Sequence, residues 1–447
     1  MNSEWAEHSV GDLFELINGY AFKSSDFKKC GIPVIKIKNV KAGAFIDDNF
    51  DFVDPDFLIS RSDKQPKQGD LLITMSGNRH DGSRETWVGK VTWFNQGKNY
   101  LVNQRVGILR LRDSGGFNAR FLAYQLSSDA FQDHFIAVAT SSGGQANLSP
   151  NQIKEMILRV PGKKIQDQIA TILGEIEDKI DLNRRINQTL EAMAQAIFKS
   201  WFVDFDPVKA RIAAIEQGED PQQAAMRAIS GKTDAELDQM PRRHHDQLAA
   251  TAALFPDAME ESELGEIPKG WDVKRIGDMI ELAYGKALKS TDRQEGSVPV
   301  YGSGGITGYH NEALVPHGAI IVGRKGTVGS LYWEDEPFFP IDTTFYVKPK
   351  AVPMTYCFYV MKTLGLDKMN TDAAVPGLNR ENVYRLELVN PSTSVLNAFD
   401  RLVSRIREAM RANETSSQSL AELRDTLLPK LLSGDISVET LMNEVAQ

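Results

Sequence analysis

Glycine-rich loops in this sequence carry basic and amide side chains, which are the residue types that contact nucleic-acid bases. The segment SGNRHDGSRE at 76–85 places several of them beside glycines, which let a backbone approach a ligand closely. Arg and Lys suit guanine edges or phosphates, and Asn and Gln suit adenine. The candidate DNA contacts in the first half of the chain are Lys36, Lys38, Asn78, Arg79, His80, Arg84, Asn103, Gln104, Arg105, Gln145 and Asn147.

The second half offers a comparable set in its own loops, YGSGGITGYH at 301–310 and GRKGT at 323–327. Any one of these residues could equally be a solvated turn residue. Because such side chains recur in corresponding loops of both halves, together they predict two DNA-reading surfaces. The candidates in this half are Tyr301, Ser303, Tyr309, His310, Arg324, Lys325, Asn379 and Arg380.

The two halves repeat one sequence frame. Residues 11–34 align with residues 277–300 without a gap, and eleven of the 24 positions are identical. Trp5 and Trp271 keep the same offset of 266. LSPNQIKEMILRVP at 148–161 corresponds to LNRENVYRLELVNP at 378–391, at an offset of 230, so the middle of the second copy is 36 residues shorter (266 − 230). A constant frame around a variable middle predicts two homologous domains that perform one task on different targets.

Each copy ends in a segment whose apolar residues step by fours and threes. The series begins Ile165, Ile169, Ile172, and the second copy repeats it from Val395 onward. This spacing is typical of a coiled-coil seam. Each segment follows a proline and spans about 38 residues, which corresponds to about 57 Å of helix.

Asparagines interrupt both seams at equivalent places, Asn183 and Asn413. A buried asparagine in a coiled-coil seam commonly fixes register and partner number. If the helices pair antiparallel, these two side chains could hydrogen-bond to each other; the alternative is a solvated polar step. We therefore expect Asn183 and Asn413 to set the register of the coiled coil.

Short β-branched runs between turn residues predict strands in each half, and helical segments follow them. The predicted fold class is α+β: two homologous recognition domains with mixed or twisted β-sheets, joined by two long helices that form an antiparallel coiled coil with an internal pseudo-twofold repeat. The expected parts are a first recognition domain at 1–160, a first spacer helix at 161–205, a connector at 206–264, a second recognition domain at 265–392, and a second spacer helix with the tail at 393–447.

The connector is rich in Ala, Gln, Glu and Asp, and we expect short helical patches without chemistry there. The pair His244 and His245 beside Arg242 and Arg243 could suggest a metal or phosphate site. No further ligand stands at suitable spacing, so an exposed loop is the preferred interpretation.

Composition limits the classes of function. The 447 residues are 42% hydrophobic and 25% charged, as in ordinary globular proteins, and no run approaches the roughly 18 apolar residues of a membrane span. Cys30 and Cys357 have no partner at metal-binding spacing, which indicates reduced thiols and a cytoplasmic location. The net charge of −9 argues against a general polyanion binder, although basic faces can be local.

The sequence lacks the common catalytic motifs. GSGGITG at 302–308 lacks the Gly-Lys-Ser/Thr of a P-loop and does not open a predicted helix. The sequence has no Asn-Pro-Pro-aromatic motif, no GxSxG and no His/Cys metal cluster. We therefore expect no catalytic residues, no metal and no cofactor bound by this chain.

The order of motifs resembles the specificity subunit of type I restriction–modification systems over essentially the whole chain. WFVDFDPV, LGEIPKGW and LLPKLLSG, together with the repeat, carry this resemblance. The resemblance implies two target recognition domains that each read one half of a bipartite, asymmetric site in double-stranded DNA. It also implies an antiparallel coiled coil that sets the half-site separation.

The same resemblance implies partners. Each helical region would bind a methyltransferase subunit, which carries S-adenosylmethionine and methylates adenine, and a separate motor-nuclease subunit would cleave unmodified DNA. Two alternatives stay open: the specificity subunit of a methylation-only or type II-like system, and a coiled-coil scaffold without DNA readout.

Overall fold

The computed structural model describes residues 5–77, 87–142, 145–369 and 377–439. The chain divides into two compact units, one made of residues 1–183 and 415–447 and the other of residues 184–414. Each unit contains one α+β region together with part of each long helix. We call the α+β region of the first unit, from Ala6 to Val160, head 1, and that of the second unit, from Met259 to Asn390, head 2. The predicted domain boundaries themselves stay a prediction.

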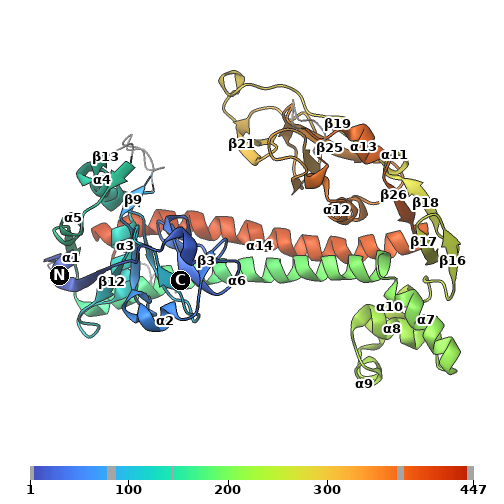
Figure 1. Ribbon diagram of the computed structural model, residues 1–447, viewed down its shortest axis with the longest axis horizontal. Coiled ribbons are helices and arrows are strands. Elements are labelled where there is room, and N and C mark those ends of the chain that lie inside the picture. Colours follow the sequence, from blue (N-terminus) through green and yellow to red (C-terminus); the bar gives the residue numbers. More distant parts are fainter. Residues whose placement is uncertain (1–4, 78–86, 143–144, 370–376, 440–447) are drawn as a thin grey trace. The chain divides into compact units, whose positions relative to one another are not determined.

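The two long helices are α6 (Lys163–Phe202) and α14 (Thr393–Ser433), and they run antiparallel as predicted (Figure 1). In the first unit, Asn183 Nδ2 donates to Ser417 Oγ at 3.2 Å. In the second unit, Asn413 Nδ2 donates to Asn187 Oδ1 at 2.8 Å, and Asn187 Nδ2 donates to the Met410 carbonyl at 2.9 Å. Both asparagines of the predicted seam therefore have a partner on the opposite helix. A bond between Asn183 and Asn413 stays a prediction.

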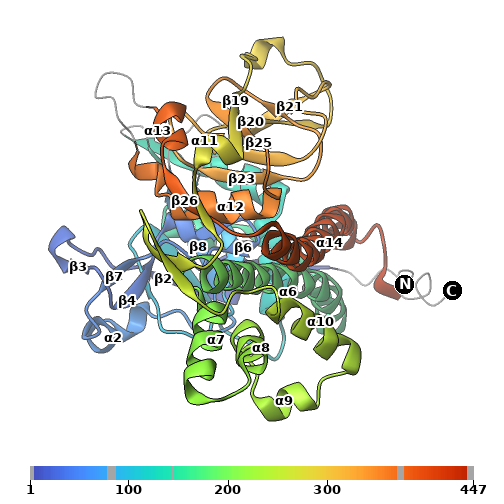
Figure 2. The same cartoon turned by 90° about the vertical axis from the view of Figure 1, so that its right-hand side faces the viewer.

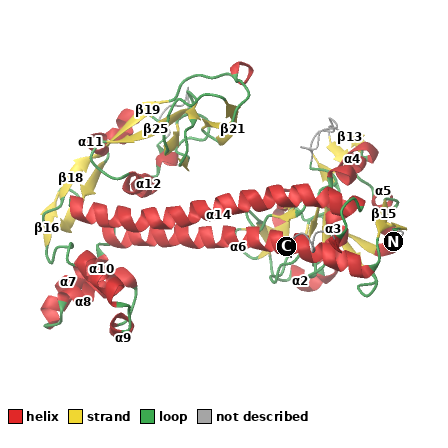
Figure 3. Cartoon of the chain, turned by 180° about the vertical axis from the view of Figure 1, so that it is seen from behind, coloured by secondary structure: helices red, strands yellow, loops and turns green. Residues whose placement is uncertain are grey.

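Each head is built on a four-stranded antiparallel sheet with the same strand order. In head 1 the order is β10 (Val91–Trp93), β8 (Leu71–Thr74), β12 (Val106–Leu111) and β2 (Phe14–Asn18). In head 2 it is β23 (Leu331–Glu334), β22 (Ala319–Gly323), β25 (Thr344–Pro349) and β19 (Ile280–Tyr284). These strands are among those drawn in yellow in Figure 3.

The central strands are buried on both faces. In β8, Leu71 and Ile73 belong to one hydrophobic cluster and Leu72 to another. In β22, Ile320 and Ile321 divide between two clusters in the same way. Because successive side chains of a strand point to opposite faces, such strands read as continuous apolar runs rather than as an alternation.

Each head also has a second, mixed sheet, as the predicted fold class requires. In head 1 its order is β11 (Leu101–Val102), β4 (Ile32–Ile35), β7 (Asp51–Val53) and β3 (Phe27–Lys28), with β11 and β4 parallel. In head 2 it is β21 (Gly305–His310), β20 (Val298–Gly302) and β24 (Phe339–Pro340), with β20 and β24 parallel.

Smaller elements complete the heads. Two-stranded ladders join β1 (Ala6–Ser9) to β15 (Ile157–Val160) and β18 (Asp272–Arg275) to β26 (Glu387–Asn390). Further strands are β5 (Val40–Lys41), β6 (Ala44–Phe45), β9 (Ser76–Gly77), β13 (Thr140–Ser142), β14 (Gln145–Asn147), β16 (Met259–Ser262) and β17 (Gly265–Pro268). The helices are α1 (Val10–Leu13), α2 (Phe57–Ser60), α3 (Ala119–Ser127), α4 (Asp129–Val138), α5 (Pro150–Lys154), α11 (Ile276–Met279), α12 (Met354–Thr363) and α13 (Arg380–Tyr384).

One glycine of the repeat is required in both heads for the same steric reason. A Cβ atom placed on Gly19 would lie 2.1 Å from the carbonyl oxygen of Asn103, and one on Gly285 would lie 2.1 Å from that of Ile341. No side chain fits at that distance. The glycine at this position therefore permits the chain just after β2 or β19 to approach the loop before β12 or β25.

The connector contains the expected helical patches, and the structure corrects only the interpretation of residues 242–245 as a loop. The connector forms α7 (Asp206–Gln217), α8 (Pro221–Ser230), α9 (Asp234–Asp238) and α10 (Arg242–Ala252), drawn in green in Figure 2. The segment with the paired arginines and histidines begins α10 and is not a loop. Leu248 and Ala252, on the same helix, pack against Met226 of α8, and this apolar packing stabilises the helix.

Each long helix ends against a tryptophan at the start of a head. Phe202 and Phe205 pack on Trp271, with ring centroids 6.2 and 5.8 Å apart. Trp5 belongs to the same hydrophobic cluster as Leu431 of α14. The tryptophans that share the repeat offset thus have equivalent structural roles. No helix among the described residues is long and apolar enough to cross a membrane.

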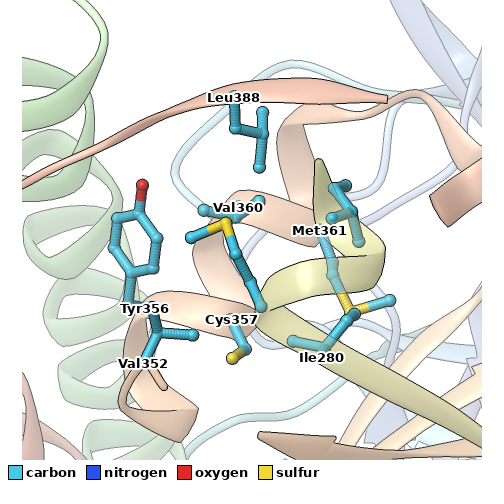
Figure 4. A pocket seen from close by; sticks show the side chains of 9 residues that line it. Ile280, Val352, Tyr356, Cys357, Val360, Met361 and Leu388 are labelled. Carbon is cyan, nitrogen blue, oxygen red and sulfur yellow. The ribbon is translucent and has the colours of Figure 1, made fainter. Parts of the chain in front are cut away.

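A small apolar cavity lies in head 2 beside α12 (Figure 4). Its volume of about 10 Å³ leaves room for no more than a water molecule. Burial raises the pKa of the Cys357 thiol to about 12, so this cysteine is a protonated core residue. The residues lining the cavity are Ile276, Met279, Ile280, Val352, Tyr356, Cys357, Val360, Met361 and Leu388.

Candidate nucleic-acid interface

The predicted contact loops of head 2 meet at one end of its four-stranded sheet. There β19 ends at Tyr284, β22 ends at Gly323, and β25 begins at Thr344. The backbone of Arg324 joins two neighbouring segments, since its N–H donates to Thr343 O at 2.9 Å and its carbonyl accepts from Leu378 N at 2.8 Å. The sheet therefore brings the loop of Arg324 and Lys325 next to the segment that carries Asn379 and Arg380.

The same hydrogen bonds occur at the corresponding end of the head 1 sheet. Met75 N–H donates to Arg105 O, and Met75 O accepts from Leu148 N, both at 2.8 Å. Met75 is thus the structural equivalent of Arg324. The segments that carry Gln104, Arg105, Gln145 and Asn147 consequently lie at this end of the sheet.

Strand β9 directly follows Met75 at this end of head 1. Ser76 and Gly77 form β9, which pairs with Asn147 and Ala146 of β14. The predicted contacts Asn78, Arg79, His80 and Arg84 lie outside the described residues.

Among the remaining candidates of head 1, Gln104 and Arg105 are exposed, and Gln145 and Asn147 are half-buried. Lys36 Nζ lies 2.8 Å from the Asp51 carboxylate and 4.1 Å from the centre of the Phe27 ring. Lys38 Nζ lies 3.7 Å from the same carboxylate.

The hydrogen bond from Lys36 is the main cause that lowers the pKa of Asp51. These lysines therefore share one anionic partner within head 1, which reduces the net positive charge of this part of the surface.

Three predicted contacts are buried within the heads. Asn103 is 8% exposed and its Oδ1 accepts from Arg105 N at 3.3 Å. Tyr301 is 6% exposed and its hydroxyl donates to Glu334 at 2.8 Å. His310 is 8% exposed and its Nδ1 accepts from Gln294 N at 3.0 Å. Each of these side chains holds a loop in place, and a base contact by any of them would require that loop to open, so their DNA contacts stay a prediction.

The other candidates of head 2 occupy different positions. Ser303 Oγ accepts from Thr327 N at 3.4 Å, which ties the 301–310 hairpin to the loop of Arg324. Tyr309 is 56% exposed on β21. Asn379 caps α13, since its Oδ1 accepts from Glu381 N at 2.9 Å, and its amide oxygen is therefore already engaged.

The sequence reasoning missed Tyr284. Tyr284 is 47% exposed at the end of β19. Two predicted contacts lie near its ring, with the guanidinium carbon of Arg324 at 4.9 Å and that of Arg380 at 4.8 Å from the ring centre. The repeat marks this position as one where the two heads differ, because the equivalent residue of the first copy is Asn18. The Tyr284 ring also packs on the buried Phe345, with ring centroids 5.0 Å apart.

A tyrosine–glutamate hydrogen bond joins each head to helix α6. Tyr124 donates to Glu177 at 2.7 Å, and Tyr359 donates to Glu191 at 3.0 Å. Burial raises the pKa of Glu177 and outweighs the opposing bonds from Tyr124 and Arg120. Burial also acts on Glu191, but there the hydrogen bonds from Gln195 and Lys362 prevail and the pKa is lowered.

These opposite shifts predict opposite pH dependence. The raised pKa of Glu177 means that its stabilising contribution is present below the unfolded value of about 4.3 and is lost as pH rises through the folded pKa. The lowered pKa of Glu191 means that its contribution is present above that value and is lost as pH falls through the folded pKa. At pH 7, Glu191→Gln is therefore expected to destabilise its unit by about 1–3 kcal/mol, whereas Glu177→Gln leaves stability unchanged or raises it.

The measurement is the midpoint of thermal unfolding of the wild type and both variants between about pH 3 and pH 8, which spans the unfolded pKa of about 4.3. Each variant serves as the matched control of the other, because both remove one carboxylate that accepts a bond from a tyrosine hydroxyl. A greater loss of stability at pH 7 from Glu177→Gln than from Glu191→Gln would contradict the assignment.

The comparisons with known proteins agree on one family. The model of the type I restriction modification DNA specificity domain matches residues 2–192 and 268–393. The type I restriction enzyme HindI specificity subunit of Haemophilus influenzae is 29% identical over 472 residues, which cover 97% of this chain and 100% of that protein. The MjaIX specificity subunit of Methanocaldococcus jannaschii is 22% identical over 77% of this chain and 75% of its own length.

A solved structure shares the fold. The S subunit of a type I restriction–modification system from M. genitalium superposes with a TM-score of 0.53 at 18% identity, over 96% of each chain. The two stretches matched by the family model fall in the two halves of the repeat and together cover more than half of the sequence. The chain therefore belongs to the type I restriction–modification DNA specificity family.

Proposed function

We propose that this chain is the DNA-reading subunit of a type I restriction–modification complex and that each head reads one half of a bipartite, asymmetric duplex site. The observation that carries this proposal is a shared backbone frame with different side chains. Met75 and Arg324 make the same two backbone hydrogen bonds in their heads, yet one side chain is apolar and the other is a guanidinium. Different side chains on one frame support different half-sites.

The chemistry would belong to partner subunits. The sequence contains none of the catalytic motifs sought, so we assign adenine methylation and S-adenosylmethionine to a methyltransferase partner, cleavage to a motor-nuclease partner, and neither catalysis nor cofactor binding to this chain. A methylation-only or type II-like complex would use this chain in the same way. The exposed Gln104 and Arg105 at the sheet end of head 1 disfavour a scaffold without DNA readout.

The DNA-reading role is tested by methylation mapping. The chain is expressed with its methyltransferase partner, and methylated adenines are located by sequencing; one bipartite motif is the expected result. Arg105→Ala should relax base preference in one half-site and leave the other half unchanged. The matched control is Arg112→Ala, an exposed arginine just beyond the opposite end of β12. Absence of a motif, or equal relaxation of both halves by Arg105→Ala, would overturn the proposal.

Equivalent apolar side chains on the long helices support the docking of two identical subunits. Met193 on α6 is 50% exposed, and Leu423, which stands 230 positions later on α14, is 47% exposed. An internal repeat can present equivalent surfaces to two copies of one partner. Exposed apolar side chains at equivalent positions suit such contacts.

Met193→Asp and Leu423→Asp are each expected to lower the affinity of one methyltransferase subunit roughly 10-fold or more, because each would bury a charge at one interface. The double variant should lose both subunits. Native mass spectrometry counts the subunits. Gln188→Asp and Gln418→Asp are the matched controls, since these exposed polar residues share the same offset. Full assembly of the Met193→Asp, Leu423→Asp double variant would contradict this docking surface.

A further inference from the structure

Tyr284, Arg324 and Arg380 form a compact group at the sheet end of head 2. They come from three separate segments: the end of β19, the loop after β22 and the start of α13. Both guanidinium carbons lie within 5 Å of the tyrosine ring centre, at 4.9 and 4.8 Å. Tyr284 is 47% exposed. The group therefore places two cations and an aromatic face together at the surface.

The two arginines are held to different degrees. The backbone of Arg324 is fixed on both sides by its bonds to Thr343 and Leu378, and its side chain donates to Asp342 O at 3.3 Å. The Arg380 Nε lies 3.4 Å from the carboxylate of Glu381 on an exposed helical turn. A guanidinium packed on an aromatic ring keeps its outer N–H groups for a ligand, in a direction limited by the ring.

The group of Tyr284, Arg324 and Arg380 occurs only in head 2, although both heads share the backbone that carries it. Within the repeat, Tyr284 corresponds to Asn18, and Arg380 corresponds to Pro150 at the offset of 230. Arg324 corresponds to Met75 by its hydrogen bonds. None of the equivalents in head 1 is cationic or aromatic. A difference concentrated at three neighbouring positions of a shared frame is expected where two heads read different bases.

We propose that these three residues form a guanine-reading site of head 2, in which Arg324 contacts the major-groove edge of a guanine and Arg380 a neighbouring phosphate. Tyr284 is a positioning residue that orients both side chains. The proposal rests on the proposed DNA-reading function and names the residues and the base class for one head. Arginine offers two parallel donors that match the O6 and N7 acceptors of guanine, whereas a phosphate contact carries no sequence preference.

The test uses the full chain with its methyltransferase partner. Methylation mapping of the wild type first defines the bipartite motif. Binding is then measured on a duplex with that motif and on duplexes with each G·C pair of one half-site replaced by A·T. Arg324→Ala should reduce discrimination at one G·C pair roughly 10- to 100-fold and leave the other half-site unchanged. Arg380→Ala should weaken binding to all duplexes alike and make it less dependent on salt.

Conservative variants keep the test decisive if the alanine variants fold poorly. Arg324→Lys retains the charge but lacks the paired donors, so it should lose discrimination while keeping most of the affinity. Tyr284→Phe should behave as wild type, whereas Tyr284→Ala should resemble Arg324→Ala. Lys348→Ala is the matched control, because Lys348 lies 5.4 Å from the Tyr346 ring centre near the other end of β25 and should leave both half-sites unchanged.

The outcomes separate the two proposals. A wild type that yields no bipartite motif would overturn the DNA-reading function itself. A wild-type motif with unchanged discrimination in both Arg324→Ala and Arg324→Lys would overturn only the guanine site. Equal relaxation of both half-sites by Arg324→Ala would do the same, because a site in head 2 can act on only one half.

Discussion

Inserting seven residues into each long helix is expected to lengthen the spacer of the recognised DNA site by about three base pairs and to leave both half-sites unchanged. Seven residues add about 10.5 Å of helix, and one base pair occupies 3.4 Å of duplex. A whole heptad also keeps the apolar seam in register. The insertions go after Asn183 and after Glu414, where the chain passes between the two units.

These positions preserve the contacts within each unit. The bond from Asn183 to Ser417 lies in the first unit, and the bond from Asn413 to Asn187 lies in the second. Methylation mapping measures the spacer. The control is the same seven-residue insertion after Lys232, an exposed position between α8 and α9, which should leave the site unaltered. An altered half-site with an unaltered spacer would contradict the spacing role of the helices.

The repeat and the heptad pattern predicted the large features of the fold because both leave periodic traces in the sequence. The connector shows where such patterns become weak. Arg242 to His245 suggested a loop, but the stretch begins α10, because Leu248 and Ala252 further along have an apolar surface on α8 to cover. A short helix of this kind is stabilised by tertiary packing, which single-sequence patterns do not report.

The candidate interface was likewise predictable from the sequence only in part. Residue type and loop position selected Arg324 and Arg380, and the fold brings them together. The same criteria selected Asn103, Tyr301 and His310, which are buried. A polar side chain that satisfies a loop backbone is the same residue type as one that contacts a base, so composition cannot separate the two uses. Tyr284 was missed because its role depends on neighbours from two other segments.

Reversing the charge of Arg407 is expected to destabilise the packing of head 2 on α14 by about 3–5 kcal/mol. The Arg407 guanidinium carbon lies 3.8 Å from the centre of the Trp333 ring, and Arg407 pairs with Asp335 of head 2 at 3.5 Å. The side chain is only 15% exposed. Arg407→Glu would place two carboxylates together with little solvent to screen them.

Thermal unfolding and limited proteolysis of head 2 measure the effect. Arg405→Glu is the matched control, since Arg405 is exposed on the same helix two residues earlier. Adding Asp335→Arg to Arg407→Glu should recover part of the stability by restoring an ion pair of opposite polarity. Equal unfolding midpoints for Arg407→Glu and Arg405→Glu would contradict the prediction.

The charge of Arg407 also helps to explain why each head packs on its own part of the two long helices. In the first unit the polarity is opposite: head 1 supplies Arg120, which lies 4.6 Å from the Trp93 ring, and α6 supplies Glu177 and Asp178 at 3.3 and 2.8 Å. Glu177 and Arg407 are equivalent positions of the repeat, since they differ by the offset of 230. A second copy of head 1 in place of head 2 would therefore set Arg120 against Arg407. Arg407→Glu should make α14 more compatible with head 1 as it becomes less compatible with head 2. The test uses a chain in which a second copy of head 1 replaces head 2. Its thermal unfolding midpoint should rise when Arg407→Glu is added, and an unchanged midpoint would contradict a role of this charge in keeping the two heads distinct.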